Sequence, residues 1–498
     1  MARMFAPPVD FNLAHHLLDA RVEEGNGQRT AIRTDHTTYT YAQVQARANR
    51  LAAALVEAGL AQEQRVILAL PDGLDFVAGL FAILKAGGVV VMINPDLPVA
   101  DLEYFFEYSR APLALVHSGQ QETFASAAAR ARLLAADQLP GEAEFANRKT
   151  HRDDPALWIF SGGTTGKPKA AVQSHRSFAN TTFHYGQQFL GLGPDDVTLA
   201  IPKLYFGYAT GLNLFFPFSV GASCCLFEQP STPEAIFERI DRHRPTLLVN
   251  VPKIIHRMAA HPQAQQHDLS CLRLCTSAGE ALPPALYSLW VDTFGVELVD
   301  GLGTAEMWHI FLSNKPGQVK PGTLGQAVPG FTIKLADDEG VPVPRGELGR
   351  LWVRGDSRAI CYWQRAEESH EAFRGPWFAS GDKLYEDEDG YFVYCGRGDD
   401  MMKVGGKWLA PLEVEDCLLR HPAVRECAVV PEIDEAGLTK PKAFVLAAEN
   451  SEGLAEELKA HTLEHLEAYK HPRSIVFVDE MPRTHLGKID RARLKAMA

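Results

Sequence analysis

Segments of two hydrophobic patterns alternate through the first part of the chain. Apolar residues recur at helical spacing over 42–58 and 74–85, whereas 65–70 and 89–93 are short, continuously apolar runs. Short apolar runs between amphipathic helices are typical of buried parallel strands joined by right-handed crossovers. The alternation continues with predicted helices at 177–188 and 233–242 and predicted strands near 197 and at 222–227, 246–251, 272–277 and 297–302.

The pattern changes near residue 321. Short apolar runs such as 332–335, 348–353 and 391–394 are now separated by Gly, Pro and Asp, which is typical of antiparallel sheet. Beyond residue 397 a third pattern begins, in which helices and strands are mixed. Its predicted helices are 412–419 and 454–466, and its predicted strands are 428–430, 443–446 and 475–478.

These three patterns predict an α/β protein with two domains. The large N-terminal domain covers 1–397, with parallel-sheet α/β subdomains to about 320 and a small antiparallel β subdomain over about 321–397. A small, mobile α+β domain follows over 398–498. The short, polar, glycine-rich segment 396–400 between the domains suits a hinge.

Composition excludes several classes of function. The 498 residues are 46% hydrophobic and 22% charged, as in ordinary soluble proteins of at least two domains. A net charge of −13 argues against a nucleic-acid partner, because such proteins carry a basic surface. The most apolar stretch, 76–93, contains Lys85 and two glycines, so it predicts a helix and a strand rather than a membrane span. The start of the chain lacks the apolar core of a secretory signal.

The eight cysteines are scattered and form no Cys-x-x-Cys pair. This distribution favours free thiols in a reducing compartment over disulfides or a zinc site. We therefore expect a cytoplasmic protein without a membrane partner.

A polar loop directly follows the apolar run 156–160. Its glycines allow backbone N–H groups to converge on an anion, so it is a candidate phosphate cradle, with a solvated Gly/Thr turn as the alternative. It does not match the nucleoside-triphosphate P-loop, because Ser161 replaces the first glycine and Pro168 follows the lysine. The loop consists of Ser161, Gly162, Gly163, Thr164, Thr165, Gly166, Lys167, Pro168 and Lys169.

Three further clusters follow this loop along the chain. They are Asp300-Gly301-Leu302-Gly303-Thr304-Ala305-Glu306, then Ser380-Gly381-Asp382 with Arg397 to Lys403, then Pro482-Arg483-Thr484 with Gly487-Lys488. In this order and spacing, the loop and the clusters resemble the motifs of the adenylate-forming superfamily of acyl-CoA synthetases, adenylation domains and luciferases. The resemblance covers essentially the whole chain.

Within that superfamily the chain resembles benzoate-CoA ligases and related aryl-CoA ligases, such as those that activate anthranilate. The segments that carry this closer resemblance are 203–208, 277–283, 306–314 and 437–443. The resemblance implies an AMP-forming acid–thiol ligase that requires ATP and Mg²⁺. An aromatic carboxylate attacks the α-phosphorus of ATP and expels pyrophosphate, and the thiol of coenzyme A then displaces AMP from the aryl-adenylate.

The resemblance also implies residue roles. Lys488, Glu306 and Thr165 are the candidate catalytic residues, and Glu306 would bind the magnesium ion. Asp382 would accept hydrogen bonds from the ribose hydroxyls, with support from Arg397. The full set of candidate ATP- and AMP-binding residues is Ser161, Gly162, Gly163, Thr164, Thr165, Gly166, Lys169, Gly279, Glu280, Ala281, Asp300, Gly301, Leu302, Gly303, Thr304, Asp382, Arg397, Lys403 and Lys488.

A second set of residues would meet the other two substrates. The candidate aryl-acid residues are Phe206, Gly207, Tyr208, Ala278, Gly303, His309 and Ile310. Gly405, Gly406, Lys407 and Trp408 would line the tunnel for coenzyme A after the C-terminal domain has rotated about a hinge near Asp399, which matches the hinge position of the family. Segment 205–208 has no acidic residue for an α-amine, which argues against amino-acid substrates.

Purely structural roles for the same residues stay open. Glu306 could be a carboxylate at a helix start, Asp382 a turn residue, His309 a core histidine and Lys488 a surface lysine. Two positions also depart from the family pattern: Ala305 replaces the usual Thr, and Ala170 replaces a frequent Gly.

Ala305 motivates one rival function, a catalytically weak adenylate-binding protein. The other rival is an aryl acid–AMP ligase that loads the pantetheine of a carrier protein. Related ligases lead us to expect a homodimer.

Overall fold

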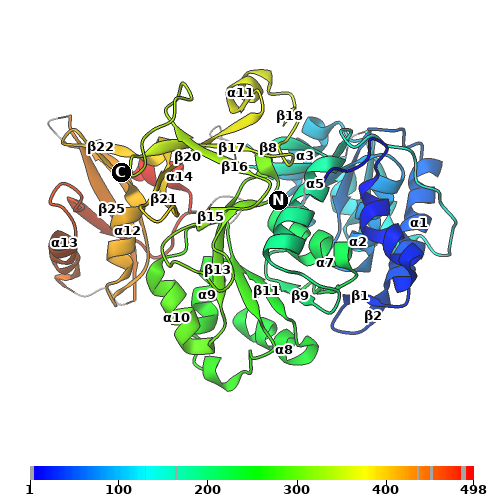
Figure 1. Cartoon of the computed structure of the whole chain (residues 1–498), viewed down its shortest axis with the longest axis horizontal. Coiled ribbons are helices and arrows are strands. Elements are labelled where there is room, and N and C mark those ends of the chain that lie inside the picture. The colour runs from blue at the N-terminus through cyan, green and yellow to red at the C-terminus, as the bar shows by residue number, and fades with distance from the viewer. Residues whose placement is uncertain (1–4, 129, 163–166, 435–436, 449–451, 484–488) are drawn as a thin grey trace.

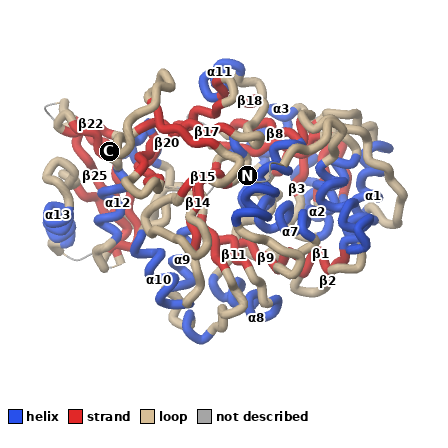
Figure 2. The backbone as a smooth tube through the Cα atoms, in the orientation of Figure 1, coloured by secondary structure: helices blue, strands red, loops and turns tan. Residues whose placement is uncertain are grey.

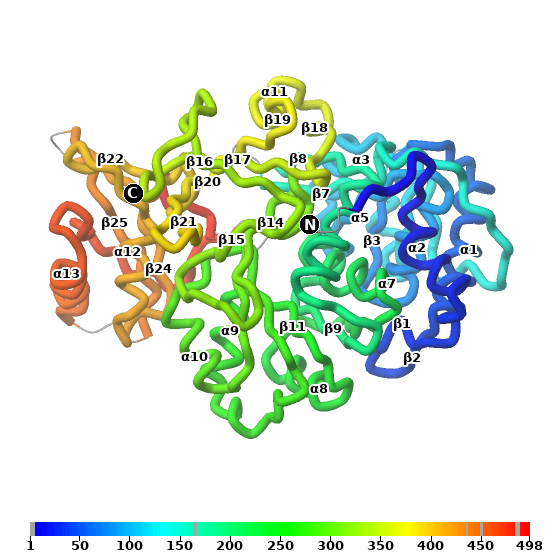
Figure 3. The backbone as a smooth tube through the Cα atoms, viewed as in Figure 1, coloured from blue at the N-terminus to red at the C-terminus, as the bar shows by residue number. Residues whose placement is uncertain are grey.

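The computed structural model describes residues 5–128, 130–162, 167–434, 437–448, 452–483 and 489–498 (Figure 1). Among the predicted site residues, Gly163, Thr164, Thr165, Gly166 and Lys488 lie outside the described residues. Figure 3 shows the course of the chain, with the first part at one end of the molecule and the last part at the other.

A seven-stranded sheet forms the core of the N-terminal end. Strands β7, β4, β3, β5 and β6 run parallel, and β8 and β18 extend the sheet antiparallel. The central strands β3, β4 and β5 are buried, which is why they appear in the sequence as continuous apolar runs. In sheet order the strands are β18 (Cys361–Tyr362), β8 (Lys169–Ser174), β7 (Pro155–Ser161), β4 (Val89–Met92), β3 (Arg65–Ala69), β5 (Leu113–Val116) and β6 (Arg132–Ala135).

A nine-stranded sheet lies beside it. Six of its strands run parallel, from β13 to β1 in sheet order, while β14 and β15 extend one edge antiparallel and β2 pairs antiparallel at the other edge. In sheet order the strands are β15 (Gln326–Ala327), β14 (Ile310–Ser313), β13 (Leu298–Gly303), β12 (Leu274–Ser277), β11 (Leu247–Asn250), β9 (Val197–Ala200), β10 (Ser223–Cys225), β1 (Thr30–Arg33) and β2 (Thr38–Thr40).

Helices cover the faces of both sheets (Figure 2). The largest buried cluster joins the two sheets through α1 and α2, and further clusters bury the opposite faces under α3 with α4 and under α8 to α10. Helix α1 begins at a capping box in which Thr40 and Gln43 exchange bonds. The helices are α1 (Tyr41–Glu57), α2 (Leu74–Lys85), α3 (Val99–Ser109), α4 (Gln121–Ala127), α5 (His175–Thr181), α6 (Gly207–Thr210), α7 (Phe216–Val220), α8 (Pro233–His243), α9 (Pro252–Ala259) and α10 (Pro284–Phe294).

A third sheet, between the α/β sheets and the last part of the chain, is antiparallel throughout. Helix α11 (Ala366–Ala372) precedes its strand β19. The strands are β16 (Thr332–Ala336), β17 (Gly349–Arg354), β20 (Trp377–Glu386), β19 (Phe373–Arg374) and β21 (Phe392–Arg397).

The chain beyond Arg397 forms a separate small unit with its own buried cluster. Asp399 lies in a 3₁₀ turn between β21 and β22, and its backbone carbonyl accepts a hydrogen bond from Lys495 Nζ at 2.9 Å. The elements are β22 (Met402–Val404), β23 (Lys407–Leu409), α12 (Pro411–Leu419), β24 (Val424–Ile433), β25 (Thr439–Ala447), α13 (Leu454–His465), β26 (Ser474–Phe477) and α14 (Arg491–Met497).

The predicted fold class is confirmed: parallel-strand α/β sheets, an antiparallel sheet and a small C-terminal α+β unit. The exact domain boundaries and the hinge stay predictions. No helix among the described residues is long and apolar enough to cross a membrane.

Candidate active site

The polar loop predicted to hold phosphate connects two antiparallel strands. Ser161 ends β7, and Lys169 begins β8 directly opposite it. Lys169 Nζ lies 3.9 Å from the ring centroid of Tyr362 and 3.0 Å from Glu368 Oε2 on α11. The described part of the loop therefore presents an ammonium group at the strand end, held by an aromatic face and one carboxylate.

Glu306 lies just beyond this ammonium, on the short 3₁₀ turn after β13. Its side chain is 6% exposed, and its Oε1 accepts a hydrogen bond from the Tyr362 hydroxyl at 2.7 Å. Tyr362 thus touches both Lys169 and Glu306 and joins the loop to the carboxylate. The Thr304 hydroxyl caps the turn by accepting from Met307 N at 3.3 Å.

The residues after Glu306 turn sharply. Trp308 has a φ of 61°, a left-handed conformation that is unfavourable for a bulky residue. Its indole is buried among the rings of Phe178, Phe215 and Phe216. This packing stabilises the strained turn, which directs Glu306 toward Tyr362 while His309 packs against Tyr208.

Asp382 and Arg397 form a pair on adjacent strands. They lie opposite each other in the β20–β21 register, and the Asp382 carboxylate is 7% exposed. Ser380 Oγ donates to Asp382 Oδ2, and the Tyr394 hydroxyl lies 3.3 Å from Oδ1. Burial opposes the charge of Arg397, but the carboxylates of Asp382 and Glu306 contribute to a pKa above its usual value.

Gly381 makes room for this pair. A Cβ atom at this position would lie 2.8 Å from Arg397 Nη2. Asp382 lies within strand β20, so its reading as a turn residue is wrong.

Asp300 lies within β13, at the last position where this strand pairs in parallel with β12. Its neighbour across the parallel pair is Ser277, and neither Asp300 Oδ1 nor Ser277 Oγ has a hydrogen-bond partner among the described residues. Burial raises the pKa of Asp300 to about 7. Unpaired buried polar atoms at the carboxyl ends of parallel strands are typical of a ligand site. The adjacent predicted residues, Gly279, Glu280 and Ala281, begin with a left-handed glycine of φ 95°.

The predicted aryl-acid residues gather around His309. Its imidazole is 2% exposed, and its Nε2 lies 3.1 Å from the Tyr208 carbonyl oxygen. Burial lowers the His309 pKa to about 3, so the ring is neutral, donates through Nε2 and keeps Nδ1 as an acceptor without a described partner. The interpretation of His309 as a core histidine bonded to a backbone carbonyl agrees with the Nε2 contact. It does not account for Nδ1, which is buried and has no partner among the described residues.

Two close approaches shape this region. The Tyr208 hydroxyl donates to Thr276 Oγ1 at 2.7 Å. A Cβ on Gly303 would lie 2.6 Å from the His309 carbonyl oxygen, and a Cβ on Gly211 would lie 2.4 Å from His309 Cδ2. Ile310 and Ala278 are buried beside them, whereas Phe206 and Gly207 are partly exposed at the start of α6.

Sequence reasoning missed three residues of this site: Tyr362, Gly211 and Asp72. Both carboxylate oxygens of Asp72 accept from the backbone N–H of Leu204, at 3.0 and 3.2 Å, and so fix the start of segment 203–208. Burial raises the pKa of Asp72 to about 7. Tyr362, Gly211 and Asp72 contact Glu306, His309 and Leu204, respectively. Each pair is more than fifty residues apart in the sequence, so no local motif reveals the contact.

The predicted tunnel residues lie elsewhere. Gly405 and Gly406 form the left-handed turn of the β22–β23 hairpin, and Trp408 is 59% exposed. Lys407 contacts Glu467 at 3.3 Å, and Lys403 Nζ lies 5.9 Å from the centroid of the Trp408 ring. In Figure 1 this hairpin lies near the left edge of the picture, whereas β13 lies near its centre. The described side-chain contacts of Lys403, Lys407 and Trp408 are made within the C-terminal unit.

Comparison with known proteins agrees with this arrangement. The family model "AMP-binding enzyme" matches residues 18–363, and "AMP-binding enzyme C-terminal domain" matches residues 413–488. The chain belongs to the AMP-binding enzyme family.

Relatives within this family align over nearly the whole chain. The benzoate–CoA ligase of Thauera aromatica is 39% identical over 98% of this chain and 96% of its own length. The crystal structure of the anthranilate CoA ligase AuaEII in complex with anthranoyl-AMP superposes with a TM-score of 0.94 at 38% identity, covering 99% of this chain and 98% of that one. A benzoate CoA ligase from Burkholderia xenovorans LB400 gives 0.90 at 38% identity, covering 97% and 100%.

Proposed function

We propose that this protein is an aryl-CoA ligase, an AMP-forming acid–thiol ligase that activates a benzoate-type carboxylic acid with ATP and transfers the acyl group to coenzyme A. The observation that carries the proposal is the contact chain from Lys169 through Tyr362 to Glu306, with the Asp382–Arg397 pair as an electrostatic neighbour of Glu306. A nucleoside triphosphate needs a cation for its phosphates, a carboxylate for its magnesium ion and a hydrogen-bond acceptor for its ribose hydroxyls. Lys169, Glu306 and Asp382 would supply these three groups.

The first half-reaction joins two anions, so its residues must neutralise charge and align the reactants. Glu306 suits a magnesium ion, because described residues bond only its Oε1 and Mg²⁺ takes one or two protein carboxylates besides phosphate and water. When bound, Mg²⁺ would offset the charge of the phosphate oxygens. Lys169 and the loop would hold the β- and γ-phosphates, and Asp382 would accept from the ribose hydroxyls while Arg397 supports it.

Lys488 is the proposed catalytic ammonium, a role that rests on its place in the C-terminal motif. It would contact the attacking carboxylate and the α-phosphate oxygens as adenylation proceeds. The second half-reaction would require the C-terminal unit to rotate near Asp399, so that the hairpin with Gly405, Gly406, Lys407 and Trp408 lines a path for pantetheine.

The substrate class follows from the aryl-acid residues. The neutral His309 ring, the Tyr208 ring and Ile310 form a largely apolar wall that suits a flat aromatic ring. The free Nδ1 acceptor of His309 favours a ring that bears one hydrogen-bond donor.

The test is direct detection of thioester product. Purified protein with Mg-ATP is given benzoate, hydroxybenzoates, aminobenzoates and cinnamate in turn, each with coenzyme A or with a phosphopantetheinyl carrier protein. We expect aryl-CoA from at least one benzoate-type acid. Product on the carrier protein alone would identify an aryl acid–AMP ligase, and no product with either acceptor would contradict the proposal.

A further inference from the structure

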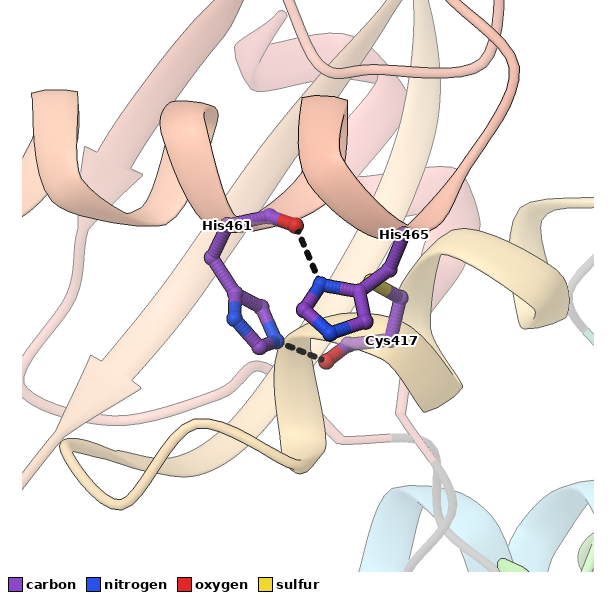
Figure 4. A group of neighbouring side chains, drawn as sticks. All are labelled: Cys417, His461 and His465. Atoms are coloured by element: carbon purple, nitrogen blue, oxygen red, sulfur yellow. Dashed lines mark hydrogen bonds between the residues drawn. The ribbon is translucent and has the colours of Figure 1, made fainter.

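Three metal-binding side chains that the proposed reaction does not use lie together in the C-terminal unit (Figure 4). Cys417 is in the last turn of α12, and His461 and His465 are one turn apart on α13. The Cys417 sulfur and one nitrogen of each imidazole all lie within 4.8 Å of one another. The sequence predicted no zinc site, because its cysteines are scattered and form no Cys-x-x-Cys pair. The structure brings Cys417 beside two histidines that lie more than forty residues further along the chain.

We propose that Cys417, His461 and His465 form a zinc-binding site that joins α12 to α13. A thiolate with two imidazoles is a donor set that Zn²⁺ prefers, whereas Mg²⁺ prefers oxygen ligands. A water molecule would complete the tetrahedron on the side where His465 is exposed. The site is therefore chemically distinct from the carboxylate site at Glu306.

The hydrogen bonds of the two imidazoles define what binding requires. His465 Nδ1 lies 2.8 Å from the backbone carbonyl oxygen of His461 and donates to it, which leaves the Nε2 lone pair for a metal. His461 Nε2 lies 3.1 Å from the carbonyl oxygen of Cys417. Zinc would replace that bond, with the His461 proton moving to Nδ1 and the thiol proton leaving to solvent.

The ligand atoms need only a small adjustment. Zinc–ligand bonds of about 2.0–2.3 Å at tetrahedral angles place the ligand atoms roughly 3.3–3.8 Å apart. The observed limit of 4.8 Å can close through rotation of His465, because this side chain is at the surface. Cys417 is 3% exposed and supplies the fixed, buried corner.

The location indicates a structural or sensing role. In Figure 1, α13 lies at the left edge of the molecule, whereas β13 lies near its centre. A metal there would hold the last turn of α13, and Glu467 just beyond that turn contacts Lys407 of the predicted tunnel hairpin. Zinc would thus rigidify the unit that is expected to rotate.

The test uses full-length protein that has been treated with a chelator and then freed of it. We expect one equivalent of Co²⁺ to bind with a strong thiolate-to-cobalt absorption band, and one equivalent of Zn²⁺ to displace it and raise the midpoint of thermal unfolding. Cys417→Ser should abolish the band, and His465→Gln, a surface change that spares the fold, should weaken Zn²⁺ binding at least tenfold.

Two matched variants serve as controls. Cys271→Ser removes a partly exposed thiol of the N-terminal domain, and His421→Gln removes an imidazole that packs beside His461 but lies 3.1 Å from Glu457. Both should keep the cobalt band and the zinc affinity. A band that survives in Cys417→Ser, or a wild-type protein that binds neither metal, would overturn the proposal.

Discussion

The two ends of the molecule prepare their candidate site residues in different ways. In the N-terminal domain, Glu306 and Asp382 are buried, and each approaches a tyrosine hydroxyl. In the C-terminal unit, Trp408 and Lys407 stand on an isolated two-stranded hairpin, and Trp408 is largely exposed. Glu306 and Asp382 already have partners within the N-terminal domain, whereas the described side-chain contacts of Lys407 and Trp408 are made within the C-terminal unit.

This difference matches the demands of the two proposed steps. Adenylation joins two anions, so its charged groups gain most from fixed positions in a dry site. Thioester formation needs a tunnel for a long, flexible thiol, and a hairpin that docks afterwards can supply one wall. Changes in the two regions should therefore have separable effects.

The largest expected effect comes from Glu306→Gln. Loss of the carboxylate should lower the adenylation rate by about 10²–10³, as when a key electrostatic contact is removed. Acid-dependent pyrophosphate release measures this step. Thioester formation from synthetic benzoyl-AMP is the internal control and should change little, and equal losses in both assays would contradict the separation of the two regions.

Gly211→Ala should damage recognition of the acid. Its new methyl group would lie 2.4 Å from His309 Cδ2, and the buried ring has little room to move. Overpacking of this kind typically costs about 1–3 kcal/mol, so we expect the KM for the aryl acid to rise about tenfold while the KM for ATP is unchanged. Gly193→Ala, where a methyl group meets open space, is the matched control. A parallel rise in both KM values would contradict a specific effect on the acid, whereas loss of folded protein would lower the maximal rate and leave both KM values unchanged.

Trp408→Ala tests the proposed role of the C-terminal hairpin in the thioester step. If this exposed indole contributes to the tunnel only after docking, the variant should raise the KM for coenzyme A several-fold and leave benzoate-dependent pyrophosphate release unchanged. Its exposure predicts little effect on folding, which thermal unfolding checks. A slower adenylation step with unchanged use of coenzyme A would sink this assignment.

The smallest effect is expected from Tyr362→Phe. The ring that faces Lys169 stays, and only the hydroxyl that donates to Glu306 Oε1 is lost. A hydrogen bond to a charged group contributes about 1.5–3 kcal/mol, part of which Mg²⁺ or water can replace. We expect a several-fold weaker activation by Mg²⁺, and weaker Mn²⁺ binding to the ATP complex measured by electron paramagnetic resonance. Tyr391→Phe, a partly exposed tyrosine in the turn between β20 and β21, should behave as wild type.

Local pattern predicted most of the fold. Helix α2 has the predicted bounds, 74–85, because its apolar residues define one long buried segment. Strand β10 is shorter than its predicted run 222–227, because only Ser223–Cys225 pair with neighbouring strands. The antiparallel sheet beyond residue 321 was also predicted correctly, because Gly, Pro and Asp separate its short apolar runs.

The site was predictable only where motifs mark it. Asp300, Glu306 and Asp382 stand in recognisable clusters, and their roles stay predictions. Tyr362, Asp72 and Gly211 carry no such signal, because each acts through a contact that exists only when distant segments pack together. The same reason hid the pairing of Cys417 with two histidines of α13, since α12 and α13 are separated by two strands.

The most direct test of the central claim is ATP–pyrophosphate exchange in the presence of Mg²⁺ and benzoate, without coenzyme A. A preassembled N-terminal site predicts exchange that depends on both the acid and the metal and needs no thiol. A folded protein that binds ATP but shows no exchange above the acid-free background with any benzoate-type acid would contradict the account.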